Sequence, residues 1–407
     1  MRQSRKLRAL QGAAAFLLAS AGLFSSNSDA QQLTPARDSS STTVIRPGVT
    51  HKRVVDSRGP WIVNVLEIDL TQPDLEIGAG RAFDRFFGRE KTSSIAQRHN
   101  AEDRTVIAAL NADFFSLRTG EIESNNIIDG VFVKGTRMTG SPFDTFDNVH
   151  SQFAMTRRGR PLIDRFAFDG AVVWRNGGTS SLTGINDLPK PQSLILFNDM
   201  YGPTTPTDTL NIPIQELPLT FVGTRSDTLL LIVSGHPSSG GTSIAKGTLV
   251  LSAYLRNEIA ISSARLGDTV KIRAGLAPNR GPIKSLVGGW PRIVLDGRNI
   301  GAVADSLEGT FPRFSANRHP RSGVGFSRDS TKVYFIIVDG RSQKSVGMSL
   351  FEFADLMLTE GVYQGMNLDG GGSTTLVIND TIVNSPTDPT GERPVGNCLL
   401  LFAKKPR

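Results

Sequence analysis

The sequence has little of the residues that thiol and metal sites need. Of its 407 residues, one is cysteine and five are histidine. A single cysteine excludes an internal disulfide and a zinc site built from thiolates. Cys398 lies in an apolar run, where a cysteine is usually inert, so we expect no catalytic thiol. The histidines include no pair at metal-ligand spacing: His51, His99, His150, His236 and His319.

Signature motifs of several protein classes are also absent. The segment 235–242 has the glycine spacing of a P-loop, but Gly241 stands where the phosphate-binding lysine is required. No G-x-S-x-G elbow and no H-E-x-x-H pair occurs. The formal charge of +7 falls to +4 without residues 1–30, which hold four basic residues and one acidic residue. No basic run is interleaved with aromatics, so we expect no nucleic-acid partner.

Residues 1–30 have the pattern of a secretory signal peptide. A basic start, Met1–Arg8, precedes an apolar stretch, Ala13–Leu23, that is too short to span a bilayer. Small residues at Ser28 and Ala30 predict cleavage after Ala30. The sequence thus predicts export to the periplasm or the extracellular medium, with no integral membrane segment after signal cleavage. An N-terminal membrane anchor is the alternative.

The rest of the chain is predicted to form one strand-rich α+β domain with a few helices. Residues 31–60 predict a flexible leader, since the first twenty are rich in Ser, Thr, Pro and Arg and lack a periodic apolar pattern. Residues 61–405 form the predicted domain. The section at about 150–280 is expected to be loop-rich, because six prolines lie within 176–218.

A few elements can be placed along this domain. Trp61–Leu70 alternates in polarity and Leu75–Ala79 follows a turn, which predicts a hairpin. Lys332–Val338 is an apolar run typical of a buried strand. Ser349 predicts the N-cap of a helix over Leu350–Thr359, whose apolar residues recur at helical spacing.

Polar residues gather at the predicted strand ends. The clearest segment is Asn367–Thr375, in which Asp369 precedes three glycines and then hydroxyl side chains. Glycines let a ligand approach the main chain closely, and consecutive N–H groups can bind an anion. A tight glycine turn capped by Asp369 is the alternative. Other strand ends carry Asn111 with Asp113, Arg321, Asp339 with Arg341, and Arg393 with Asn397.

Seven segments along the chain combine glycines with polar and charged residues: NADFF (111–115), VGGWPRIVLDG (287–297), HPRSGVGFS (319–327), VDGR (338–341), GMSL (347–350), NLDGGGSTTLV (367–377) and ERPVGN (392–397). In these segments the chain resembles the phosphodiester glycosidase family. The resemblance keeps the family's order and covers Val106 to Phe402, although 150–280 matches poorly. The family commonly has a second glycine where this chain has Asp113.

This resemblance implies an exported hydrolase that cleaves a sugar-1-phosphodiester, with α-N-acetylglucosamine-1-phosphate diesters of an envelope or extracellular glycan as the expected substrate. A planar guanidinium can grip two phosphate oxygens, so Arg321 and Arg393 are expected to clamp the phosphate. Asp369, with Asp339 as second choice, is expected to activate water or stabilise an oxocarbenium-like transition state. The expected sugar or phosphate contacts are Asn111, Asp113, Gly370, Gly371, Gly372, Ser373, Thr374 and Asn397.

Three other functions fit the same residues. A phosphodiesterase would cut the P–O bond and would typically need metals. A glycosidase for neutral or acidic polysaccharides would use the arginines on carboxylates or sulfate. A non-catalytic carbohydrate-binding module would bind without turnover. No cofactor is expected to be required; Ca²⁺ is the metal for which oxygen ligands are plentiful, although no loop has a known calcium motif.

Overall fold

The computed structural model describes residues 38–141, 144–207, 212–225, 228–254, 261 and 263–405. The predicted signal peptide lies outside these residues. All elements below belong to the unit Ala36–Arg407. In the part of the chain that is described, no helix is long and apolar enough to cross a membrane.

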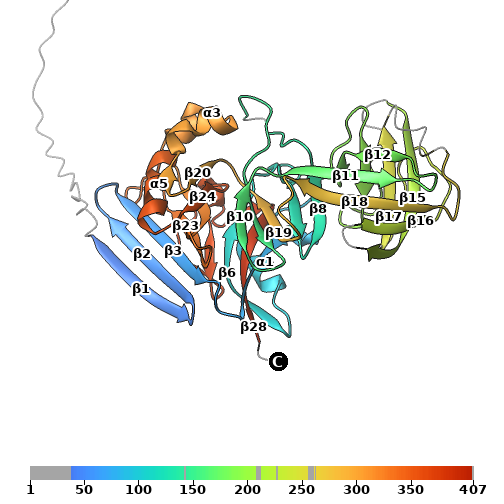
Figure 1. The fold of residues 1–407 in the computed structure, drawn as a ribbon. Coiled ribbons are helices and arrows are strands. Elements are labelled where there is room, and N and C mark those ends of the chain that lie inside the picture. The colour runs from blue at the N-terminus through green and yellow to red at the C-terminus, as the bar shows by residue number, and fades with distance from the viewer. Residues whose placement is uncertain are drawn as a thin grey trace, which may run out of the picture. The chain divides into compact units, whose positions relative to one another are not determined.

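The first sheet starts before the predicted domain boundary. β1 pairs with β2, and β2 pairs along its whole length with β3 (Figure 1). The predicted flexible leader is therefore wrong over residues 39–56, because neighbouring strands satisfy the backbone groups of these polar residues. The strand order is β1 (Ser39–Arg46), β2 (Val49–Asp56), β3 (Trp61–Asp69), β23 (Lys332–Val338), β22 (Arg321–Phe326), β24 (Gln364–Asn367), β20 (Arg292–Leu295) and β21 (Arg298–Asn299).

A second sheet has five strands. β4 belongs to this sheet and pairs with β28 along Asn397–Ala403, whereas β3 belongs to the first sheet. The predicted hairpin of β3 with β4 is therefore wrong, although both strands form. The order is β26 (Thr381–Ile382), β25 (Leu376–Ile378), β6 (Arg104–Asn111), β28 (Asn397–Lys404) and β4 (Leu75–Arg81). A separate pair joins β27 (Pro394–Val395) to β5 (Glu90–Lys91).

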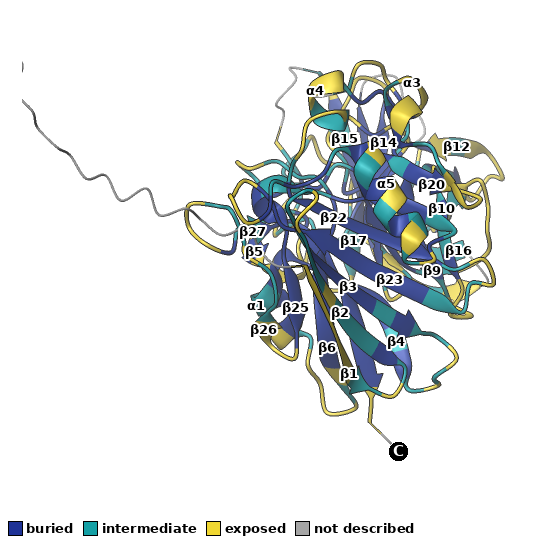
Figure 2. Cartoon of the chain, turned by 90° about the vertical axis from the view of Figure 1, so that its left-hand side faces the viewer, coloured by how far each residue is buried: buried dark blue, intermediate teal, exposed yellow. Residues whose placement is uncertain are grey.

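These two sheets share a core. On β23, Val333, Phe335 and Ile337 pack in one cluster with residues of β6 and β28, whereas Tyr334 and Ile336 pack toward α5. Both faces of the strand are thus covered, which explains its continuous apolar run. β22 and β23 are buried nearly throughout (Figure 2). A further cluster places α1 against the five-stranded sheet.

The third sheet contradicts the predicted loop-rich section at about 150–280. Ten of its strands lie there, and their own core includes Leu196, Leu217 and Leu251. Five of the six prolines lie between strands and Pro218 lies within β15, so these prolines do not mark one continuous loop. The order is β10 (Pro161–Asp164), β9 (Gln152–Thr156), β19 (Ile283–Gly288), β7 (Asn126–Ile128), β8 (Val131–Thr136), β13 (Gly184–Ile185), β14 (Leu194–Phe197), β17 (Thr248–Tyr254), β15 (Ile214–Arg225), β16 (Thr228–Val233), β18 (Thr269–Ala277), β11 (Ala167–Val173) and β12 (Thr179–Leu182).

Helices are few and short, so the strand-rich prediction is confirmed, whereas the α+β label stays a prediction. Ser349 caps α5 as predicted, because its hydroxyl accepts from the Glu352 amide while Glu352 accepts from the Ser349 amide. The helices are α1 (Thr92–Arg98), α3 (Ala304–Glu308), α4 (Pro312–Ser315) and α5 (Leu350–Thr359), with 3-10 turns η1 (Ala82–Asp84), η3 (Gly301–Val303) and η4 (Gly371–Ser373).

Candidate functional site

The glycine segment 369–374 lies where the ends of several strands meet. The Asp369 amide donates to the Ala112 carbonyl at 2.8 Å, and the Gly371 amide donates to the Pro320 carbonyl at 2.9 Å. The segment is therefore fixed between the residues that follow β6 and those that precede β22. Three of the predicted motifs, distant in sequence, become neighbours here.

The buried side chain of Asn111 connects these strand ends through hydrogen bonds. Its side chain is fully buried, and its Nδ2 donates to the Asp369 carbonyl at 2.6 Å. Its Oδ1 accepts from the Ser322 hydroxyl at 2.7 Å and from the Thr375 amide at 3.0 Å. One amide side chain thus connects β6, β22 and the residues on both sides of the glycines. Its predicted contact with a sugar stays a prediction.

Asp113 is a buried carboxylate next to this segment. It accepts from the Ser124 amide at 3.1 Å and from the Ser124 hydroxyl at 3.4 Å, and its own amide donates to Asn397 Oδ1 at 2.8 Å. A side chain at Gly288 would overlap the Asp113 carboxylate, so the glycine pair before Trp290 makes room for it. Burial raises the pKa of Asp113 to about 7, against the opposing effects of the Ser124 amide and the Lys134 charge.

Asp369 retains partial exposure and has cations nearby. Burial raises the pKa of Asp369 to about 6. A hydrogen bond with Ser373 and the charges of Arg393 and Arg341 oppose that rise, because each favours the carboxylate. Asp369 is therefore ionised at neutral pH, as a general base or an electrostatic stabiliser must be.

Arg393 lies against the glycine segment, and its predicted role as a phosphate clamp stays a prediction. Its Nη1 donates to the Ser373 hydroxyl at 3.3 Å, and its Nε donates to Asp388 at 2.6 Å. A side chain at Gly372 would overlap the guanidinium, so this glycine allows the arginine to lie against the main chain. Arg393 is thus oriented by Asp388, and its charge favours the carboxylate of Asp369.

Arg341 is a second cation beside the glycine segment. It is exposed, and a Cβ at Gly371, where φ is +61°, would come within 2.8 Å of its Nη2. Its charge lowers the pKa of Asp369. The sequence had placed Arg341 at a strand end without giving it a role in the site.

The guanidinium of Arg321 is buried and hydrogen-bonds to main-chain carbonyls of the protein. Its side chain is 1% exposed, and Nε donates to the Met348 carbonyl at 2.8 Å. Its Nη2 donates to the carbonyls of Phe314 and Asn317 at 2.7 and 3.0 Å. These bonds hold the segment around α4 to β22. The predicted phosphate clamp at Arg321 gains no support from them, because they occupy the Nε and Nη2 donors.

Asp339 connects to the glycine segment through a second side chain. Its carboxylate accepts from the Ser385 amide at 3.1 Å and from Asn384 Nδ2 at 3.3 Å. Asn384 Nδ2 also donates to the Thr374 carbonyl at 3.0 Å. Burial raises the pKa of Asp339, and the bonds to Ser385 and Asn384 lower it. Its contacts therefore position the loop after β26, and its catalytic role as second choice stays a prediction.

Glu123 is a residue of the site that sequence reasoning missed. Its amide donates to the Phe114 carbonyl at 3.0 Å, in a short antiparallel contact that brings residues 121–124 alongside 113–116. Burial raises the pKa of Glu123 to about 8, and the charges of Asp113, Asp144 and Asp369 add to the rise. The only sequence signal is the pair of glutamates at 121 and 123, which is too common to identify a site.

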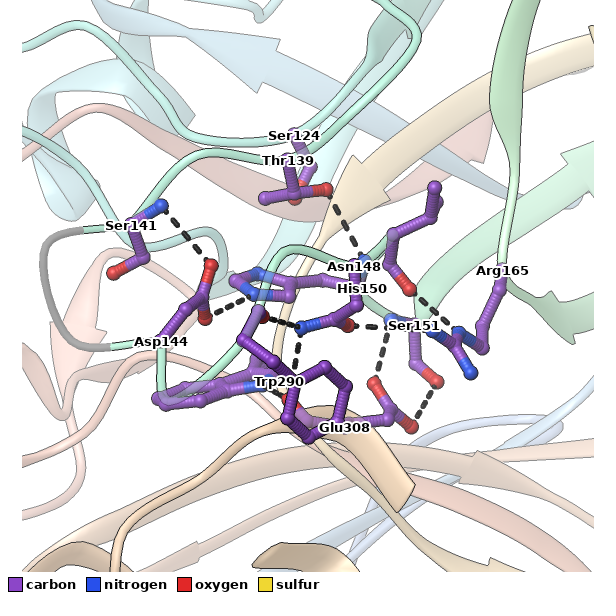
Figure 3. A network of polar contacts seen from close by, with 12 residues as sticks. Ser124, Thr139, Ser141, Asp144, Asn148, His150, Ser151, Arg165, Trp290 and Glu308 are labelled. Carbon is purple, nitrogen blue, oxygen red and sulfur yellow. Dashed lines mark hydrogen bonds and ion pairs between the residues drawn. The ribbon is translucent and has the colours of Figure 1, made fainter. Parts of the chain in front are cut away.

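An aromatic cluster borders these carboxylates. Trp290 contacts Phe114 edge-on with ring centroids 5.8 Å apart, and it stacks on Phe314 at 5.1 Å and on His150 at 5.0 Å. Figure 3 shows the polar side of this cluster, where His150 Nε2 lies 2.7 Å from an oxygen of Asp144. Trp290 is 2% exposed and its Nε1 donates to the Glu308 carbonyl at 2.6 Å, so burial and this hydrogen bond hold its indole ring in place.

Several buried polar atoms around the segment have no hydrogen-bond partner within the described residues: Glu123 Oε2, Thr374 Oγ1 and Asn397 Nδ2. Buried polar groups are nearly always paired, so these atoms have capacity for a water or a ligand. The same part of the chain contains no group of three His, Cys, Asp or Glu side chains arranged to hold a metal. The expectation of Ca²⁺ stays untested.

Comparison with solved structures defines the class of fold. A hypothetical protein from Synechocystis aligns with a TM-score of 0.70 over 90% of this chain and 64% of that chain, at 19% identity. At this identity the likeness concerns the fold alone.

Comparison of sequences gives the family. Residues 232–402 match the model of the phosphodiester glycosidase family. The match includes Asp369, Arg341 and Arg393, and it begins after the segments 111–115 and 121–124.

Curated relatives match over shorter stretches. The N-acetylglucosamine-1-phosphodiester alpha-N-acetylglucosaminidase of Bos taurus is 39% identical over 80 residues, which are 20% of this chain and 15% of that enzyme. An uncharacterized SPbeta prophage-derived protein of Bacillus subtilis, YomE, is 38% identical over 84 residues, which are 21% of this chain and 13% of that protein.

Proposed function

We propose that the protein is a hydrolase that cleaves the glycosidic C–O bond of a sugar-1-phosphodiester. One observation carries the proposal: Arg393 and Arg341 both lie against the glycine segment, next to the ionised carboxylate of Asp369. An anion-binding surface beside a carboxylate is what the reaction needs, because negative charge develops on the phosphate while positive charge develops at the anomeric carbon.

The arginines and the glycine main chain would bind the phosphate. Arg393 is oriented by Asp388, and Arg341 is exposed and free to approach a phosphate from solvent. Both stabilise the charge that builds on the departing phosphate as the C–O bond breaks. Arg321, which the sequence favoured for this role, is instead proposed to support the fold of the site through its three carbonyl contacts.

Asp369 would act at the anomeric carbon. Its pKa of about 6 keeps it ionised at neutral pH, so it can accept a proton from the attacking water or stabilise the oxocarbenium-like transition state. The phosphate is a good leaving group and takes the electron pair of the breaking bond. The reaction therefore depends more on charge stabilisation than on full proton transfer to the leaving oxygen.

The substrate class is proposed from the family and the curated relatives. An α-N-acetylglucosamine-1-phosphate diester is the first compound to test, since the bovine relative is named for that bond. The secretory pattern of residues 1–30 supports export with cleavage after Ala30. Intact-mass analysis of exported protein checks this, and a mass that includes Met1–Ala30 contradicts it.

The test is incubation with an α-N-acetylglucosamine-1-phosphodiester and identification of the products. We expect free N-acetylglucosamine and a phosphate monoester. N-acetylglucosamine-1-phosphate as the product would indicate cleavage of the P–O bond and favour a phosphodiesterase. Binding without turnover, retained when Asp369 is replaced by Asn, would indicate a carbohydrate-binding module.

A further inference from the structure

A pocket of about 220 Å³ lies where strands of two sheets end. Residues of β4, β9, β19 and β28 line it, together with the turn that joins β9 to β10. Asn397, the first residue of β28, accepts from the Asp113 amide, whereas Lys404, its last residue, lines the pocket. The two ends of this eight-residue strand are about 23 Å apart, at about 3.3 Å per residue. The pocket is therefore distinct from the candidate site at the glycine segment.

Cations outnumber acids around this pocket. Among the described residues that line it, one is acidic, Glu76, and four are basic: Lys284, Lys404, Arg157 and Arg158. Lys284 Nζ pairs with one oxygen of Glu76, and Lys404 Nζ pairs with the other at 2.8 Å. One carboxylate therefore offsets only one of the two lysine charges. An ammonium group has three N–H donors, so each lysine retains donors for a further acceptor.

The two arginines add to this excess of positive charge. Both are exposed, and neither forms an ion pair with another residue that the structure describes. A side chain at Gly130, where φ is +84°, would overlap the Arg157 guanidinium, and the Arg157 amide donates to the Pro282 carbonyl at 3.0 Å. The Gly130 amide donates to the Lys284 carbonyl at 2.7 Å. Main-chain contacts thus hold Arg157 close to Lys284.

The acids that adjoin these segments have other cations as partners. Asp74, which precedes the lining residue Leu75, pairs with Arg46. Asp129, which precedes Gly130, has its carboxylate 3.8 Å from an Nη of Arg104. These carboxylates are therefore engaged outside the pocket, and the excess of positive charge at the pocket remains.

The size and the lining of the pocket limit the ligand. Its volume lies below the range of about 300–1,000 Å³ that is typical of sites for drug-sized ligands, so a small ligand fits. Leu75, Ile77 and Met155 are buried apolar residues of the lining, so the cations supply the polar contacts. A phosphate group has several acceptor oxygens and can accept from ammonium and guanidinium groups at the same time.

We propose that this pocket binds a phosphate group, either as the free anion or as part of a phosphorylated sugar. Lys284 and Lys404 donate to it from the strands, and Arg157 and Arg158 donate from the turn after β9. Binding should weaken as the salt concentration rises, because ions screen exposed charges. This second site uses no residue of the glycine segment, so it does not depend on the proposed function.

Methyl NMR of protein labelled with ¹³C-methyl methionine tests the pocket directly. The chain has seven methionines, and Met155 lines the pocket. Inorganic phosphate, titrated against chloride at constant ionic strength, should shift the Met155 signal saturably, and Met155→Leu assigns that signal. A second titration with glucose 6-phosphate distinguishes the sources: tighter binding identifies a phosphorylated sugar, and equal or weaker binding identifies the free anion. A Met155 signal that neither compound shifts saturably overturns the proposal.

Charge variants should change the affinity in opposite directions. Lys404→Gln and Arg158→Gln each remove an exposed cation and should weaken phosphate binding about two- to fivefold. Glu76→Gln removes the competing carboxylate and should tighten binding by a similar factor. Lys271→Gln makes the matched change at an exposed lysine of β18 and should leave the affinity unchanged. Weaker binding in Glu76→Gln, or equal losses in Lys271→Gln and Lys404→Gln, would overturn the proposal.

A further variant separates this site from the proposed function. Arg393→Ala removes a cation of the glycine segment and should leave the Met155 titration as in the wild type. Loss of the Met155 shift in Arg393→Ala would mean that the signal reports binding at the glycine segment, and the proposed pocket site would be wrong. If no sugar phosphodiester is turned over, the proposed function fails, whereas the Met155 titration still tests the pocket.

Discussion

Arg393 and Arg321 lie in two regions that use the guanidinium differently. Around Arg393, the glycine segment leaves the side chain partly exposed beside Asp369, with Asp388 as its orienting partner. Around Arg321, the guanidinium is enclosed and donates to the carbonyls of Phe314, Asn317 and Met348. The first region can bind an anion from solvent, and the second holds the chain around α4 in place.

Strand geometry explains the difference. The main chain of residues 320–322 lies beside the glycine segment, as the bonds to Gly371 and Leu368 show. Side chains alternate along β22, so Ser322 faces Asn111 while Arg321 shares its face with Gly323, which lies against Phe353 and Met357. An arginine can thus belong to a site's strand and point away from the site.

The largest effect is expected at the carboxylate of the first region. Asp369→Asn removes the charge with little change in shape and should lower kcat about 10²–10⁴-fold, the range for a general base or acid. Circular dichroism should show an unchanged fold. Turnover within a few-fold of wild type would mean that the reacting carboxylate lies elsewhere in the cluster.

Arg393→Ala should follow, with a loss of about 2–4 kcal/mol of transition-state stabilisation on the charged phosphodiester. Arg393→Lys should recover only part, because a point charge cannot reproduce a bidentate grip. The measurement is kcat/KM on the phosphodiester and on a glycoside with a neutral leaving group. Equal losses on both substrates would show that Arg393 supports the fold rather than the phosphate.

Arg321→Ala should lower stability more than catalysis, the opposite of what we expect for Arg393→Ala. It removes the guanidinium donor of three carbonyls in a buried region. In the part of the chain that the structure describes, only the Met348 carbonyl among them also accepts from a backbone amide, that of His319. We expect about 2–4 kcal/mol less free energy of unfolding. Denaturant unfolding measures this. The kcat of the folded fraction should change by less than about tenfold, since no transition-state contact is lost. A stable variant that loses catalysis would restore Arg321 as a phosphate clamp and remove the contrast between the two regions.

The smallest effect on turnover is expected at Cys398, which lies on β28 opposite Asn111. The thiol is fully buried, and burial raises its pKa, so it is not a nucleophile. Cys398→Ser should keep turnover within a few-fold while costing about 1–3 kcal/mol of stability for the buried hydroxyl. Inactivation of a folded Cys398→Ser variant would contradict the purely structural role of this part of β28.

The sequence predicts those features that local patterns determine. The apolar run of β23 is predictable because both faces of the strand are buried. The capping box of α5 is predictable because of its Ser-x-x-Glu spacing. The glycine segment predicts close approach of a ligand to the main chain, although the sequence does not show that Arg393 lies against it. β1 and β2 could not be predicted from a local pattern, because their sequences are polar and backbone pairing holds them in the sheet.

Long-range contacts determine those features of the fold and the site that the sequence does not predict. Glu123 enters the site through a contact of residues 121–124 with 113–116, and nothing in its own neighbourhood distinguishes it from Glu121. Strands of 167–277 such as β11 and β18 pair although they are distant in sequence, so their shared core cannot be predicted from local patterns. The face on which Arg321 points depends on strand register, which the sequence does not state.

The central claim is that the glycine segment and its arginines serve cleavage of a C–O bond. Hydrolysis in ¹⁸O-labelled water, with both products analysed by mass spectrometry, tests it most directly. The account predicts that the label appears on the anomeric oxygen of the released sugar and that the phosphate monoester remains unlabelled. Label on the phosphate would contradict it, because water would then have attacked phosphorus.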